Sequence, residues 1–168
     1  MVVNTVSTMK TWLMMRHGKS SWESNVDDLD RPLNNRGIDD AHRMGLFLAS
    51  ENLSFDAAYS SPAIRAAHTA LIVAKELAFP LYKLQFSKML YDFNGDQVLE
   101  FIRCLSDDQD TVITFGHNHA CTSLSQSLGG VADKNIPTAA AVLFRFDVSL
   151  WSSITTGTAK CYFPKMIT

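Results

Sequence analysis

Short apolar runs and longer amphipathic segments follow one another along this chain. The runs have the length of strands, and they predict buried strands at 11–15, 56–60, 84–86, 111–115, 139–146 and 159–163. Apolar residues between them recur every three or four positions and predict helices at 35–51, 62–77, 97–105 and 120–128. Strands that alternate with helices indicate an α/β layered fold with a mainly parallel sheet.

Polar and small residues mark the ends of these helices. Asn34 or Asn35 is placed to cap the first helix through its side-chain oxygen. Ser61 is placed as the cap of the second helix, with Pro62 at its first position. Gly129-Gly130 is expected to end the last helix. These boundaries divide the chain into elements without a break that would separate two domains.

The chain has 168 residues, of which 46% are hydrophobic and 19% are charged. That length is enough for one full hydrophobic core, and we expect a single catalytic domain over 1–168, with residues 1–10 as a loose lead-in. A net charge of -2 gives no indication of binding to nucleic acid or to an acidic membrane surface. No apolar run approaches the roughly 20 residues that cross a bilayer.

The cysteines and the N-terminus indicate a compartment. Cys104, Cys121 and Cys161 are widely spaced and odd in number, so they form no disulfide or metal pattern and read as core thiols in a reducing environment. Residues 1–10 lack the basic region and long apolar stretch of a signal peptide. We therefore expect a cytoplasmic protein, and we expect it to be a monomer.

Three polar signals directly follow three of the predicted strands. Arg16-His17-Gly18 ends the first run, Arg65 lies in the first part of the helix after the second, and His117 follows the apolar strand 111–115. Ligands of α/β proteins bind beyond the carboxyl ends of the strands, where these residues would meet. Gly18 would let the chain turn sharply and approach a ligand closely.

Two arginines and two histidines in one place suit a phosphoryl group. Guanidinium groups match phosphate oxygens, and Arg65 also lies near a helix N-terminus, which favours an anion. An unprotonated histidine is a nucleophile. The assignment that follows is that His17 attacks phosphorus in line, while Arg16, Arg65 and His117 hold the equatorial oxygens. The nearby positive charge should keep His17 unprotonated.

Four segments together resemble the histidine phosphatase superfamily, and more closely its short SixA-type branch of phosphohistidine phosphatases. The resemblance extends roughly from Lys10 to Phe163 and rests on the segments Arg16-His17-Gly18-Lys19-Ser20-Ser21-Trp22, Asp30-Arg31-Pro32-Leu33-Asn34 with Arg36-Gly37, Ser60–Ala70 and Gly116-His117-Asn118. It implies a three-layer α/β/α fold of the phosphoglycerate-mutase type with a mixed, mainly parallel sheet. It also implies a phosphorylated intermediate on His17, a phosphate pocket of Arg16, Arg65 and His117, and neither metal nor organic cofactor.

Two departures from that family bear on the chemistry. His119 stands where the branch often has proline, which should alter the loop after His117. Many relatives place a carboxylic acid to protonate the leaving group; here Asp92 is a candidate general acid and Glu23 is another. A phosphohistidine substrate needs this proton less than an alcohol does, because imidazole can carry its own.

Several alternatives stay open at this stage. His117 and His119 form a His-x-His pair, but no carboxylate or cysteine at ligand spacing supports a metal site. Lys19 and Ser20 could touch a phosphate, and Trp22 could line the pocket rim or cover the loop. The expected function is hydrolysis of protein phosphohistidine. The alternatives are a broad phosphomonoesterase of small molecules and a non-catalytic phospho-binding module.

Overall fold

A computed structural model describes residues 9–131 and 135–167 of the chain. The strands in these residues are β1 (Lys10–Arg16), β2 (Ala57–Ser60), β3 (Leu84–Phe86), β4 (Thr111–Gly116), β5 (Ala141–Phe146) and β6 (Thr158–Tyr162). The α-helices are α1 (Asn35–Ser50), α2 (Ile64–Glu76), α3 (Asp96–Arg103) and α4 (Ala120–Gly129). Short 3-10 turns separate them, including η1 (Asp28–Asp30) in the loop between β1 and α1.

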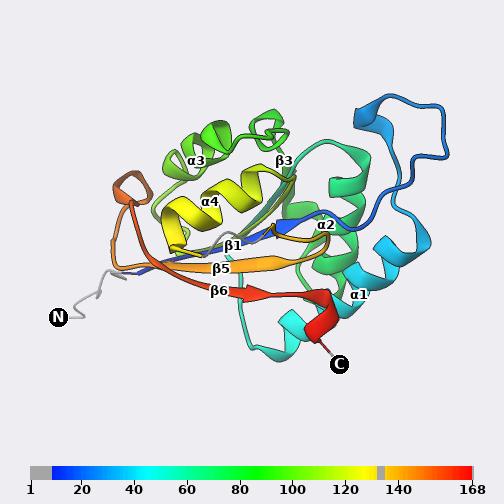
Figure 1. Cartoon of the computed structure of the whole chain (residues 1–168). Coiled ribbons are helices and arrows are strands. Elements are labelled where there is room, and N and C mark those ends of the chain that lie inside the picture. Colours follow the sequence, from blue (N-terminus) through cyan, green and yellow to red (C-terminus); the bar gives the residue numbers. More distant parts are fainter. Residues whose placement is uncertain (1–8, 132–134, 168) are drawn as a thin grey trace.

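The strands form one mixed sheet in the order β3-β2-β4-β1-β5-β6. Pairing is parallel from β3 to β1, whereas β5 lies antiparallel to β1 and β6 antiparallel to β5. In the register of the central pair, Arg16 lies opposite Gly116, so β1 and β4 end side by side. The loop from β1 to α1 projects beyond this end of the sheet (Figure 1).

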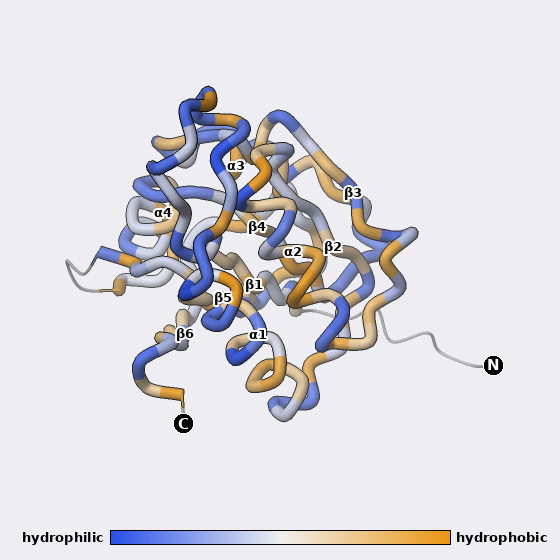
Figure 2. Tube along the Cα trace, turned by 90° about the vertical axis from the view of Figure 1, so that its right-hand side faces the viewer, coloured by the Kyte–Doolittle hydropathy of each residue, from blue (hydrophilic) through white to orange (hydrophobic). Residues whose placement is uncertain are grey.

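Helices cover both faces of the sheet. Alternate side chains of β1 point to opposite faces and are apolar on both, so each face needs a layer of helices to bury it. Trp12 and Met14 belong to a core that also holds residues of α3 and α4, and Leu13 and Met15 belong to a core with residues of α1 and α2. Hydrophilic and hydrophobic residues follow one another along α1, as expected for a helix with one buried face (Figure 2). The predicted α/β/α fold with a mixed sheet is confirmed.

The predicted helix boundaries are confirmed at α1 and shifted at α2. Asn34 caps α1 by accepting a hydrogen bond from the Gly37 N–H (2.9 Å). Helix α2 begins at Ile64, so Ser61 is not its cap and Pro62 is not its first residue. The Ser61 hydroxyl accepts from the Ala63 N–H instead and contacts a histidine of the site, which extends the turn before the helix.

The expectation for residues 1–10 is wrong at Lys10. Its side chain is 1% exposed, and its ammonium group donates to the main chain of Asp107 (2.6 Å) and forms an ion pair with Asp110 (2.8 Å). The acceptors lie in the turn before β4, and these contacts hold Lys10 at the start of β1. Residues 1–8 lie outside the described residues. None of the helices in the described part of the chain is long and apolar enough to cross a membrane.

Candidate active site

A cavity of about 190 Å³ lies at the carboxyl ends of β1 and β4. It is lined by residues of the loop after β1, of the first turn of α2 and of three further loops: Arg16, His17, Lys19, Ser20, Trp22, Asp28, Arg31, Arg65, Phe93, Asn118 and Thr138. Four of these side chains are arginine or lysine and one is aspartate, so the cavity is cationic. The structure therefore brings His17, Arg16 and Arg65 together from separate elements.

His17 is held in one orientation. Its ring is 7% exposed, and its Nδ1 atom lies 2.7 Å from the Gly18 carbonyl oxygen, so Nδ1 carries the proton and donates. The lone pair is then on Nε2, where Arg65 Nε donates at 3.3 Å. Burial is the main cause that lowers the pKa of His17, to about 3; the Gly18 hydrogen bond opposes it, and the charges of Arg65, Arg16 and Arg31 add to it. His17 is therefore neutral at pH 7, chiefly because of burial.

Gly18 lies against the start of α1. A Cβ at this position would lie 2.6 Å from the Gly37 carbonyl oxygen. A Cβ on Gly37 would in turn lie 2.1 Å from the Lys19 carbonyl oxygen. The two glycines let the chain after His17 press against the start of α1, and this contact fixes the position of Lys19 in the cavity wall.

Arg65 is 1% exposed and contacts three groups of the site. Its Nε atom faces His17, and its Nη2 atom lies 3.3 Å from His117 Nδ1. Both terminal nitrogens also donate to Asp28: Nη1 to the main-chain carbonyl and Nη2 to the carboxylate Oδ2 (2.9 Å). Arg65 is thus the centre of a network that joins α2, β4 and the loop after β1.

His117 contacts Arg65 and is not among the residues that line the cavity. It is 1% exposed, its Nδ1 atom faces Arg65, and its Nε2 atom lies 2.8 Å from the Ser61 hydroxyl. Burial lowers the pKa of His117 to about 2, with His17 and Arg65 adding to the effect. Both ring nitrogens are therefore engaged in this state, and His117 contacts the site through Arg65 and through the His17 ring, with the two imidazole centroids 5.3 Å apart.

The guanidinium of Arg16 is only partly used in hydrogen bonds to the described residues. Its Nη1 atom donates to the Ile136 carbonyl oxygen (2.6 Å), while its buried Nε atom has no hydrogen-bond partner within residues 9–131 and 135–167. Burial lowers the pKa of Arg16 from its usual value. A buried N–H without an acceptor is costly, and an oxyanion in the cavity that Arg16 lines would relieve that cost.

Asp92 does not occupy the position of a general acid, which corrects that candidate. Its carboxylate is buried and accepts four backbone N–H groups: Oδ1 accepts from Asn94 (3.1 Å), and Oδ2 accepts from Gly95 (3.0 Å), Gln97 (3.0 Å) and Val98 (3.2 Å). The Asp92 carboxylate therefore caps the N-terminus of α3 from the loop before the N-cap residue, Gly95. Glu23, the other candidate, is exposed and lies outside the lining of the cavity.

The carboxylate that does line the cavity is Asp28, which sequence analysis missed. Burial raises its pKa, but hydrogen bonds from Tyr91 (2.6 Å), Arg65 and Arg31 (3.0 Å) outweigh this and hold the pKa well below its usual range. Asp28 is one of several acidic residues in the loop, and no local signal distinguishes it. No local sequence pattern marks its partner Tyr91 either.

The remaining loop residues form the rim. Arg31 donates to the Ser20 hydroxyl (2.7 Å), and its guanidinium stacks on the Trp22 ring at 3.6 Å. Trp22 thus both lines the rim and covers the loop. Lys19 is exposed and lines the cavity, as does the buried Ser20. Among the residues that the structure describes, no group of three metal-ligating side chains gathers at one point.

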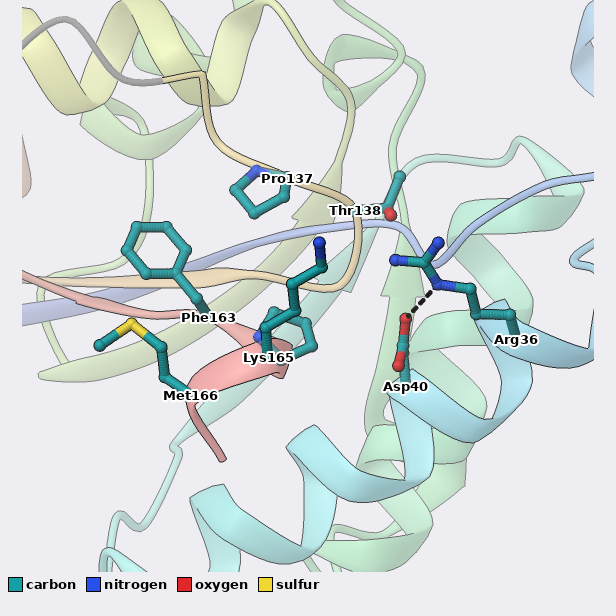
Figure 3. A pocket seen from close by; sticks show the side chains of 8 residues that line it. Arg36, Asp40, Pro137, Thr138, Phe163, Lys165 and Met166 are labelled. Carbon is teal, nitrogen blue, oxygen red and sulfur yellow. Dashed lines mark ion pairs between the residues drawn. The ribbon is translucent and has the colours of Figure 1, made fainter. Parts of the chain in front are cut away.

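A larger cavity of about 380 Å³ adjoins this one and shares Thr138 with it. Phe163 and Met166 lie on one side of it, and Arg36, which is paired with Asp40 (3.5 Å), lies on the other (Figure 3). Its lining contains no histidine, cysteine or hydroxyl with an adjacent base. The smaller cavity, which holds a nucleophile, is therefore the candidate active site.

The family model of the histidine phosphatase superfamily (branch 1) matches residues 12–98. This chain belongs to that superfamily. The match takes in the end of β1 and the start of α2, and so includes nine of the eleven cavity residues, Arg16, His17 and Arg65 among them. A phosphatase-superfamily chain with a neutral histidine in a cationic cavity has the parts that phosphoryl transfer requires.

Relatives of this superfamily chain differ in how much of it they cover. A 2,3-bisphosphoglycerate-dependent phosphoglycerate mutase of Azorhizobium caulinodans is 40% identical over 70 residues, which are 39% of this chain and 33% of the mutase. The chain thus matches about a third of that enzyme's length. An uncharacterized protein of Mycobacterium tuberculosis is 28% identical over 139 residues, covering 80% of this chain and 82% of the relative.

The fold is also that of a solved SixA structure. The protein histidine phosphatase SixA, complexed with tungstate, superposes with a TM-score of 0.80 and 21% identity, covering 94% of this chain and 99% of SixA. The nearly full coverage of both chains shows that this protein has the SixA fold without a large insertion.

Proposed function

We propose that this protein is a cytoplasmic, monomeric phosphatase that transfers a phosphoryl group to His17 and then to water, with protein phosphohistidine as its substrate. The observation that carries the proposal is the state of His17: a neutral ring with its Nε2 lone pair at a cationic cavity. Arg16 and Arg65 would bind the equatorial oxygens. His117 would hold the Arg65 guanidinium in position through its Nδ1 atom.

The first step exchanges one N–P bond for another. The Nε2 lone pair of His17 attacks phosphorus, the N–P bond of the substrate breaks, and its electron pair leaves with the substrate imidazole. When the far nitrogen of that imidazole carries a proton, the leaving group departs neutral and needs no acid. In the second step water attacks phosphorus, dihydrogen phosphate leaves, and His17 regains its lone pair on Nε2.

The carboxylate in the cavity supports this substrate class. Asp28 is held ionised by Tyr91, Arg65 and Arg31, so it is a poor proton donor in this state. An alkoxide leaving group depends on such a donor, whereas a protonated imidazole does not. The site therefore favours a phosphoramidate over an alkyl phosphate. The SixA relative, named as a protein histidine phosphatase, supports the same class.

The test has two parts. Acid-labile, base-stable phosphate should appear on the wild-type protein after rapid quench, and it should be absent from H17N. The rate on a phosphohistidine protein should exceed the rate on p-nitrophenyl phosphate. Faster turnover of the small ester would favour a broad phosphomonoesterase instead. Stoichiometric binding without turnover would indicate a phospho-binding module, and an H17N protein that hydrolyses as fast as wild type would exclude the mechanism.

A further inference from the structure

The hydrogen bonds of Arg65 are incompatible with the phosphate-binding role just proposed unless some of them break. Its two terminal nitrogens both donate to Asp28, one to the main chain and one to the carboxylate (2.9 Å). Its Nε atom donates to the lone pair of His17 Nε2 at 3.3 Å. That lone pair must be free to attack phosphorus, so at least this bond is exchanged when a phosphoryl group binds.

Asp28 fills the role that a phosphoryl oxygen would take. It is an anion in the cavity wall, and it occupies both terminal nitrogens of Arg65, one with its carboxylate and one with its main-chain carbonyl, so the fork of donors that a phosphate would take is filled. Tyr91 (2.6 Å) and Arg31 (3.0 Å) hold the carboxylate in place. Its side chain is 43% exposed and belongs to η1 in a surface loop, so water is available to it once it leaves Arg65.

We propose that Asp28 is an internal competitor of the substrate, whose carboxylate occupies Arg65 in the free protein and is displaced when a phosphoryl group binds. This inference rests on the proposed function. The exchange keeps the buried guanidinium paired in both states, which avoids the cost of an uncompensated buried charge. It also favours release of the product, because Asp28 returns to Arg65 as phosphate departs.

The test is the affinity for inorganic phosphate, measured by calorimetric titration at fixed salt. D28N keeps the shape of the side chain but removes its charge, and it should bind phosphate more tightly by on the order of tenfold. Y91F removes one hydrogen bond that holds Asp28 and should shift the affinity in the same direction by a smaller factor. D30N is the matched control: Asp30 is an exposed neighbour in the same turn, and within the described part of the chain the aspartate that Arg65 binds is Asp28.

The outcomes separate the inference from the proposed function. Tighter binding by D28N, with D30N within about twofold of wild type, supports the competitor. Equal or weaker binding by D28N overturns it, because Asp28 would then orient Arg65 for phosphate or have no effect. Equal tightening in D28N and D30N also overturns it, since that would be a general charge effect. An R65A protein that binds phosphate like wild type would instead refute the phosphate pocket itself.

Discussion

Removing the Asp92 carboxylate should destabilise the protein without removing a proton donor from the reaction. In D92A, four backbone N–H groups lose their acceptor. Asn94 and Gln97 are exposed and can bind water, whereas Gly95 and Val98 are buried. A buried N–H without a partner costs about 1–3 kcal/mol, so the two together predict a loss of about 2–6 kcal/mol.

Urea unfolding followed by circular dichroism measures this loss. D92N should cost only about 1 kcal/mol, because an amide oxygen in the place of Oδ2 keeps three of the four hydrogen bonds. D96N, an exposed position in the first turn of the same helix, should stay within about 0.5 kcal/mol of wild type. The reasoning fails if D92A unfolds at the wild-type urea concentration.

The same variants decide between the two roles of Asp92. A cap acts through stability, so folded D92N should retain most of the wild-type kcat on an aryl phosphate. A general acid would produce the opposite pattern, with kcat reduced about a hundredfold or more in a protein of nearly wild-type stability. Measuring both quantities on one preparation therefore separates the cap from the acid.

Two further predictions concern stability. The pKa values of His17 and His117 are about 3 and about 2, below the 6.5 of an unfolded histidine, so the unfolded state gains protons first as pH falls. The unfolding free energy should decrease by about 2–4 kcal/mol from pH 7 to pH 5, and H17Q should show about half this decrease; a pH-independent value would contradict it. Gly37→Ala should cost at least about 2 kcal/mol, because its Cβ would lie 2.1 Å from the Lys19 carbonyl oxygen, whereas Gly116→Ala, with 3.5 Å to the nearest atom, should cost less.

The elements of the fold were predictable because their signals are local. The runs at β1 and β4 are apolar over a strand length, and Asn34 stands directly before a helical pattern. The strands β1 and β2 are both parallel to β4, so they end at the same edge of the sheet. This explains why His17, which follows β1, meets Arg65, which follows β2. Periodicity and chain direction suffice for such inferences.

The partners of polar side chains were not predictable in the same way. Asp28 lies 37 positions from Arg65 and 63 from Tyr91, and the loop that carries it has other aspartates at 27 and 30. Lys10 likewise looks like part of a polar lead-in until the turn before β4 supplies its acceptors. These contacts depend on distances between elements, which no local pattern contains.

The amino-acid sequence by itself determined the layered α/β architecture and the gathering of His17, Arg16 and Arg65 beyond the strand ends. Only the tertiary structure decided what those residues touch: the lone pair of His17 faces Arg65, Asp92 caps a helix, and Asp28 holds the guanidinium. The physical reason is that apolar periodicity places whole elements, whereas a buried polar group takes whichever partner the packed elements bring within hydrogen-bond distance.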